Sequence, residues 1–170
     1  MKTVPKIGLI LGCSLAALAA LTLRPAGAEH FDISLRVDAP HSRGESAMDT
    51  TPPIGGVNPR PIVRAKAGEE IRVVWRMKNI FPHDSMKKVM IHFFVVKEGK
   101  TGQKPVPDPA GDAGIVDNSF VMDFAPKAEA NGKLRIKLSE PGSYLVRVQS
   151  EDTHQDHDHE HFSAIDVEVE

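Results

Sequence analysis

The feature that most constrains this chain is a repeated alternation of apolar and polar side chains with a period of two. It is clearest in residues 31–38, 71–78, 134–138, 144–149 and 165–170. Successive side chains of a β-strand point to opposite faces of a sheet, so this period indicates strands with one buried and one exposed face. No stretch shows the repeat of an amphipathic helix. The chain is therefore predicted to be built from β-strands.

Three further segments fit strands of other kinds. Residues 89–96 are apolar on both faces apart from His92, which suits a central strand. Residues 120–124 place apolar side chains on one face, and residues 62–67 fit a short edge strand. Together these segments predict an all-β fold, a single antiparallel Greek-key β-sandwich of about seven or eight strands.

Two long connections interrupt this pattern. Residues 39–61 are rich in Pro, Gly, Ser and Thr, and residues 99–118 contain several prolines and glycines. Both exceed ordinary loop lengths, which leaves two interpretations: surface decoration or functional segments.

The N-terminal segment has the features of an export signal. Lys2 and Lys6 precede an apolar run over residues 7–23, and Ala26 and Ala28 form the small-x-small pattern that signal peptidase accepts. The run is short for a membrane-spanning helix, which needs about 20 apolar residues. We therefore expect residues 1–28 to be a signal peptide that is cleaved after Ala28.

Cleavage would leave one β-sandwich domain, residues 29–170, in the periplasm or secreted, without a membrane span. Lipidation at Cys13 is the alternative, but the apolar stretch before Cys13 is too short for a signal core and continues beyond it. Cys13 is the only cysteine, so the cleaved domain has neither a disulfide nor a thiolate ligand. The net charge is −2 before the basic signal is removed, which argues against a nucleic-acid partner.

Short motifs resemble a known family. An Ala-Gly-acid turn at residues 67–69 leads into a strand that ends in Trp75 and is followed by Asn79, and a later Pro-Gly-x-Tyr sequence ends at Tyr144. These motifs resemble cupredoxin-like domains, within the wider group of cupredoxin-like and immunoglobulin-like β-sandwiches. The resemblance implies the sandwich architecture. It does not extend to blue-copper electron transfer, because residues 145–148 lack the cysteine whose thiolate that site needs.

The strongest chemical signal is a histidine-rich loop at residues 151–161. Its histidines are His154, His157, His159 and His161, and the last three recur with a period of two. In an extended chain these three fall on one face with Cα atoms about 6 to 7 Å apart, and imidazole suits copper and zinc. We therefore predict divalent metal binding here, with a solvated acidic loop as the alternative interpretation.

A second, weaker metal candidate combines histidine with methionine. It consists of His83 and Met86, together with Met90 and His92 on the predicted central strand. Imidazole and thioether ligands together favour copper. The alternative is that the methionines fill gaps in the core and that His92 has a structural role.

These observations predict an exported β-sandwich module that binds divalent copper or zinc through its histidine-rich loop, in a metal-handling role. The alternative is a structural or protein-interaction module of the cell envelope that binds no metal and docks an envelope protein. We expect no enzyme activity, because the sequence has neither a Gly-rich phosphate loop nor a Gly-x-Ser-x-Gly elbow.

Overall fold

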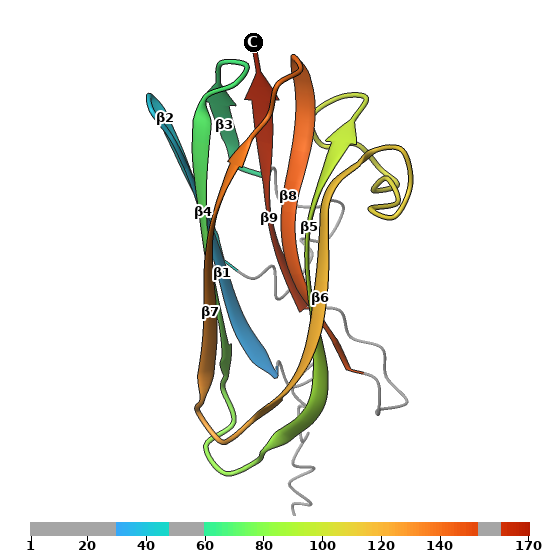
Figure 1. Cartoon of the computed structure of the whole chain (residues 1–170). Coiled ribbons are helices and arrows are strands. Elements are labelled where there is room, and N and C mark those ends of the chain that lie inside the picture. Colours follow the sequence, from blue (N-terminus) through green and yellow to red (C-terminus); the bar gives the residue numbers. More distant parts are fainter. Residues whose placement is uncertain (1–29, 48–59, 153–160) are drawn as a thin grey trace, which may run out of the picture.

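The structure, a computed structural model, describes residues 30–47, 60–152 and 161–170, and its strands form two sheets that face each other (Figure 1). The four-stranded sheet has the order β2 (Ser42–Ala47), β1 (Phe31–Ala39), β4 (Glu70–Asn79), β7 (Glu129–Lys137). The five-stranded sheet has the order β3 (Ile62–Ala65), β9 (His161–Val169), β8 (Gly142–Asp152), β5 (Met86–Glu98), β6 (Gly114–Phe124). The predicted signal peptide lies outside the described residues.

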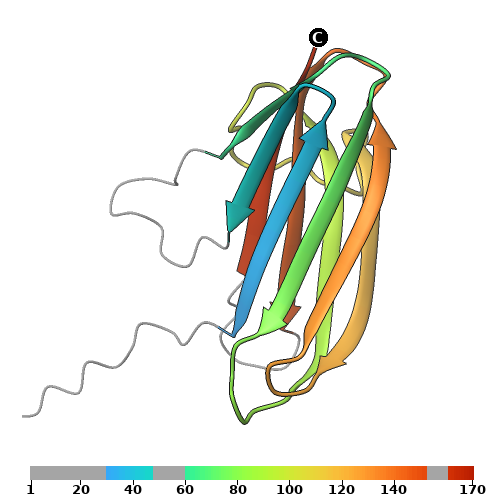
Figure 2. The ribbon, with the colours of Figure 1, turned by 90° about the vertical axis from the view of Figure 1, so that its left-hand side faces the viewer.

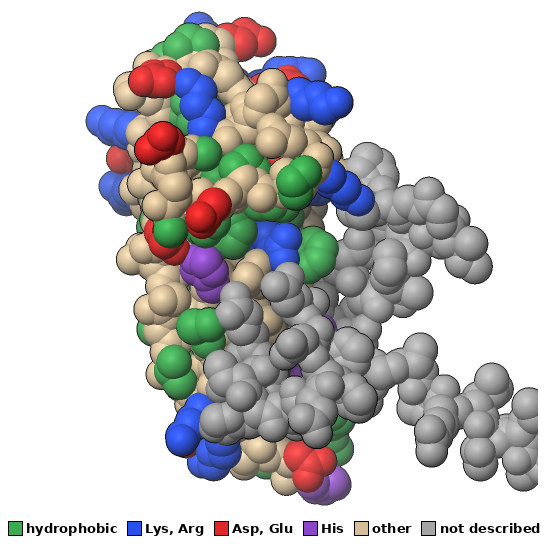
Figure 3. All heavy atoms as spheres, turned by 90° about the vertical axis from the view of Figure 1, so that its right-hand side faces the viewer, with side chains coloured by type: hydrophobic (Ala, Val, Ile, Leu, Met, Phe, Trp, Pro, Cys, Tyr) green, Lys and Arg blue, Asp and Glu red, His purple; other side chains and the backbone are tan. Residues whose placement is uncertain are grey.

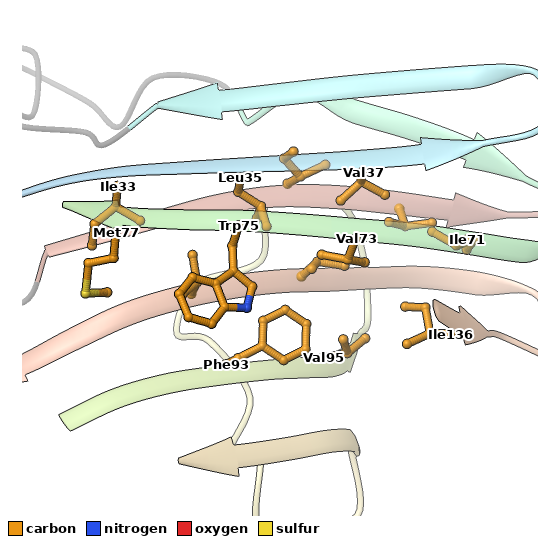
Figure 4. Close-up of a cluster of buried hydrophobic side chains, with 14 of the residues drawn as sticks. Ile33, Leu35, Val37, Ile71, Val73, Trp75, Met77, Phe93, Val95 and Ile136 are labelled. Carbon is orange, nitrogen blue, oxygen red and sulfur yellow. The ribbon is translucent and has the colours of Figure 1, made fainter. Parts of the chain in front are cut away.

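The alternating segments form strands as predicted, because in each of them one set of alternate side chains is apolar and points to the space between the sheets. β1 alternates buried and half-buried residues along most of its length, and β4 does the same. Trp75, Leu35, Met77 and Phe93 are among the side chains that fill the interior (Figure 4). Burying each large apolar side chain contributes about 1.5–3 kcal/mol. The predicted all-β sandwich is thus confirmed.

The chain crosses from one sheet to the other after β2, β3, β4, β6 and β7, as in the Greek-key connections of β-sandwiches. The corner between β7 and β8 carries a second mark of this architecture. The Tyr144 hydroxyl donates a hydrogen bond to the backbone carbonyl of Glu140, four residues upstream, at 2.7 Å. A tyrosine corner of this kind is a hallmark of immunoglobulin-like sandwiches, and the chain has an immunoglobulin-like β-sandwich fold.

Two features of the sheets differ from the sequence prediction. The connection predicted over residues 39–61 contains β2, which forms a hairpin with β1. Its one buried residue is Gly44, where a Cβ would lie 2.8 Å from Val63 Cγ2, so the absence of a side chain allows this close packing. In addition, β3 pairs with β9 in parallel, whereas the prediction was entirely antiparallel.

The other long connection, predicted over residues 99–118, is shorter in the structure because β6 begins at Gly114. Its first part is bonded to the outer face of the five-stranded sheet. The Thr101 hydroxyl donates to the Glu168 carboxylate at 2.9 Å, and the Gly102 amide donates to Asp166 at 3.1 Å. Val106 packs on a small apolar cluster of this face, formed by Phe94, Val96, Leu145 and Ala164.

A buried ion cluster lies beside this connection. The Arg60 guanidinium contacts the Glu98 carboxylate at 3.0 Å and the Asp166 carboxylate at 2.8 Å, and both acids are almost fully buried. Burial raises the pKa of Glu98 and the pKa of Asp166, and Arg60 opposes both shifts. The cluster joins the residue before β3 to the adjacent strand β9 and to the end of β5, which lies beyond β8 in the same sheet.

Candidate interaction surface

The predicted metal ligands fall into two groups. His154, His157 and His159 lie outside the described residues, whereas His161 is the first residue of β9 and is buried. The His30 amide donates to Nε2 of His161 at 3.3 Å, and the His161 ring contacts the rings of His30 and Phe31. This nitrogen of His161 therefore already has a hydrogen-bond partner within the sandwich.

The weaker candidates are not brought to one place. Met86 is buried in the core, whereas Met90 and His92 point to the outer face of β5, and His83 is exposed between β4 and β5. His92 forms a 2.6 Å contact between Nε2 and the Asp117 carboxylate. Over residues 30–47, 60–152 and 161–170, no group of three or more side chains of the metal-binding types comes together. Metal binding therefore stays a prediction from the sequence.

The geometry points instead to a strand edge. Each sheet ends in two edge strands, β2 and β7 in one sheet and β3 and β6 in the other. An edge strand presents unpaired backbone N–H and C=O groups, which can pair with another chain. β3 has four residues and β2 has six, whereas β6 has eleven. β6 is therefore the longest such edge in the described part of the chain.

Natural edge strands usually carry lysine, proline or other devices that prevent pairing. β7 follows this rule, because its outward-facing residues include Glu129, Lys133, Arg135 and Lys137. β6 follows it less closely, because residues 114–124 contain two aspartates but no lysine, arginine or proline. The longest edge is thus also the one without basic side chains or proline.

β6 is also uncovered. Residues 117–121 are all exposed, and large apolar side chains of β6 account for most of the exposed ones in the described residues. Val121 is 60% exposed, Ile115 48% and Phe120 42%. Figure 3 shows the face of the molecule formed by the five-stranded sheet, on which hydrophobic side chains lie exposed among charged ones. An incoming strand at this edge would meet both apolar side chains and free backbone.

Phe120 makes the β6 edge apolar on the face that points towards the opposite sheet. It pairs in register with Ile91, which is fully buried, so Phe120 points to the space between the sheets although it is partly exposed. Its ring lies 6.0 Å from the indole of Trp75 on the opposite sheet. The open side of the sandwich beside β6 is therefore lined by aromatic side chains.

The two carboxylates of β6 already have partners within the sheet. Asp117 contacts His92, and the Asp123 carboxylate accepts from the Lys88 amide at 2.9 Å and from the Lys87 ammonium at 3.0 Å. These two hydrogen bonds, the backbone one first, lower the pKa of Asp123, so the carboxylate is ionised at neutral pH. Neither acid requires a cation from a ligand.

Two irregularities in the pairing of β5 with β6 bound the regular part of this edge. The register between β5 and β6 shifts between Met86 and Val89 and again between Val95 and Val96. Between the shifts, pairing runs without interruption from Val89 opposite Met122 to Val95 opposite Val116. β-Bulges that bracket a ladder fix its register. Residues 116–122 of β6 are thus paired regularly with β5, and the extra residue at the second shift is Ile115 of β6 itself.

A regular edge strand with exposed apolar side chains can accept an extended peptide as a further strand of its sheet. Sequence reasoning placed a strand only at residues 120–124 and did not identify this surface. The available signal was the run of residues 114–124 without lysine, arginine or proline. Which strand lies at an edge depends on the chain topology and cannot be read from alternation.

Comparisons with known proteins give a structural likeness alone. No family model matches the sequence, and no curated protein matches it. Among solved structures, the CARDB domain of a Pyrococcus furiosus protein, determined by solution NMR, is similar to this chain with a TM-score of 0.46 and 10% sequence identity. The match covers 83% of this chain and 96% of that domain. Function is therefore inferred from the chain's own residues.

Proposed function

We propose that this chain is a protein-interaction module of the cell envelope, which binds an extended, uncharged segment of a partner protein along β6. The observation that carries the proposal is that the longest edge strand is exposed and lacks basic side chains and proline. The envelope location rests on the export signal predicted from the sequence.

The backbone of β6 would supply affinity. In an antiparallel or parallel ladder, alternate residues of an edge strand direct their N–H and C=O groups away from the sheet, where a partner strand can bond them. The inner side chains of the partner segment would contact Phe120 and extend the apolar packing that Phe120 shares with Trp75. Its outer side chains would lie beside Val121, which is the most exposed large apolar residue of the edge.

The charge of this edge sets the chemistry of the segment. Asp117 and Asp123 already contact His92 and Lys87, so a cationic ligand side chain would compete with these contacts and an anionic one would be repelled by the carboxylates. A charged side chain on the inner side would also be desolvated against Phe120. A segment of alternating apolar and neutral polar residues fits both conditions.

The binding test uses a fluorescently labelled octapeptide of alternating valine and threonine between Gly-Ser linkers, titrated with residues 29–170 and followed by anisotropy. A version with a central proline, which removes one N–H, serves as the peptide control. Phe120→Lys places a charge on the inner side of the edge. Ile80→Lys is the matched protein control, because Ile80 is exposed to a similar degree but lies outside the strands.

We expect saturable binding that weakens by at least about tenfold in Phe120→Lys and with the proline peptide, and that persists in Ile80→Lys. Val121→Lys provides a second edge variant, since its side chain is exposed and the change spares the core. Equal binding by all variants would place the peptide elsewhere and overturn the proposal. Self-association of the chain that is lost in Val121→Lys would assign the edge to a second copy instead of a partner.

A further inference from the structure

We propose that the edge of β7 binds an acidic extended peptide through a basic row formed by Lys133, Arg135 and Lys137. This inference concerns the other sheet and is independent of the function proposed for β6. Figure 2 shows β7, in orange, along the border of the four-stranded sheet. In the described residues β7 pairs with β4 and with no other strand, so its second edge is unpaired.

The three cations of the basic row lie on one face of one strand. They alternate with Leu134 and Ile136, which point to the core, so all three project from the outer face of the sheet. All three are exposed. Lys133 and Lys137 form no ion pair within the part of the chain that the structure describes, and Arg135 has a long contact of 3.5 Å with Glu70.

The neighbouring strand places one charge of each sign beside the basic row. Arg72 of β4 lies directly opposite Arg135 in the ladder, and Glu70 lies opposite Lys137. Like charges directly opposite each other destabilise a sheet, so the Arg72–Arg135 pair does not stabilise the fold. The acids of the same outer face are largely compensated nearby, because Asp38 contacts Arg36 and Arg43 while Asp32 contacts Arg76. The chain as a whole has a net charge of −2, so the positive charge is a local property.

The spacing of the basic row matches the repeat of an extended peptide. Residues two apart in a strand lie about 6.6–6.8 Å apart, and a peptide lying alongside β7 repeats its own side chains at that same interval. Acidic residues at every second position would therefore each face one cation, and cross-strand pairs of opposite charge are favourable. The basic side chains that keep uncharged strands away from this edge would select an acidic one.

The probe is a labelled octapeptide of alternating threonine and aspartate, compared with an isomer in which four threonines precede four aspartates. Both have the same charge, so the pair separates strand pairing from general attraction between charges. The protein variants are Lys133→Gln/Arg135→Gln/Lys137→Gln and a control with the same charge change, Lys66→Gln/Lys100→Gln/Lys104→Gln. The control lysines are exposed and lie outside the strands.

We expect the alternating peptide to bind with an affinity that falls by at least about tenfold in the β7 variant and with the block isomer, and that persists in the control. NMR shifts on titration should cluster on β7 amides. Equal affinity for the two isomers, an equal loss in both variants, no binding, or shifts confined to β6 would each overturn the inference. Because Phe120→Lys leaves β7 unchanged, failure here does not affect the β6 proposal.

Discussion

The ring of Phe120 lies 6.0 Å from the indole of Trp75 and connects an exposed edge strand to the buried core of the opposite sheet. Trp75 is the only tryptophan, so its emission reports on this contact. Phe120→Ala should shift the emission to the red, because water gains access to the indole. It should also cost about 1–2 kcal/mol of unfolding free energy, less than a fully buried phenylalanine. Urea unfolding followed by fluorescence checks both effects, and unchanged emission would refute the contact.

Gly132 of β7 lies against the same indole. It pairs with Trp75 in the ladder, and a Cβ at this position would overlap the ring. Gly132→Ala should therefore lower the unfolding free energy by about 1–3 kcal/mol, as overpacking does. Asn131→Ala, at the exposed neighbouring position, is the control and should change stability by less than about 0.5 kcal/mol. Equal effects of the two changes in denaturant unfolding would contradict this packing.

The alternating strands could be predicted from sequence because burial on one face imposes a period of two on residues 31–38 and 71–78. β2 could not be predicted in this way, since its buried residue is Gly44, and glycine carries no apolar signal. Most of β6 could not be predicted from the sequence for a related reason. Asp117, Asn118 and Ser119 are exposed at an edge, where no burial constrains their type.

The candidate site was less predictable than the fold. The density of histidines in residues 151–161 predicts a metal site there, but the structure shows that His161 accepts a hydrogen bond within the sandwich. The β6 surface depends on which strand ends the five-stranded sheet, and the unpaired edge beside the β7 row depends on which strand ends the other. Both relationships join residues distant in sequence, which local patterns do not encode.

The cluster around Arg60 predicts a mutation whose effect depends on pH. Arg60→Gln leaves the buried carboxylates of Glu98 and Asp166 without their cation and should cost about 3–5 kcal/mol at neutral pH. Both pKa values are already raised by burial, so the folded state takes up protons before the unfolded state as pH falls. The contribution of Glu98 and Asp166 to the unfolding free energy therefore increases as pH falls towards the pKa values that these groups have in the unfolded chain.

It follows that the cost of Arg60→Gln should shrink as pH falls below neutral, as the orphaned acids become protonated. Urea unfolding at several pH values measures this. Arg64→Gln is the control, because Arg64 and its partner Glu168 are more exposed, and its cost should stay below about 1 kcal/mol at every pH. A cost for Arg60→Gln that does not change with pH would contradict the buried cluster.

Metal binding is a separate prediction. Calorimetric titration with Cu(II) and Zn(II) should show one saturable site that is lost when His154, His157 and His159 are replaced by alanine. Affinity should fall as pH drops through the histidine range, because imidazole must be neutral to bind. His161→Ala should lower stability, since it removes the acceptor of the His30 amide. Retention of tight binding in the triple variant would refute the histidine-rich loop as the site.

The most direct test of the central claim is amide hydrogen exchange of β6, measured by NMR with and without the alternating valine–threonine peptide. If β6 accepts a further strand, its alternate amides that face away from β5 become slower to exchange when peptide is present, because they donate to the new strand. The same amides stay fast in Phe120→Lys. Protection at another edge, or no change along residues 114–124, would contradict the assignment of β6 as the binding surface.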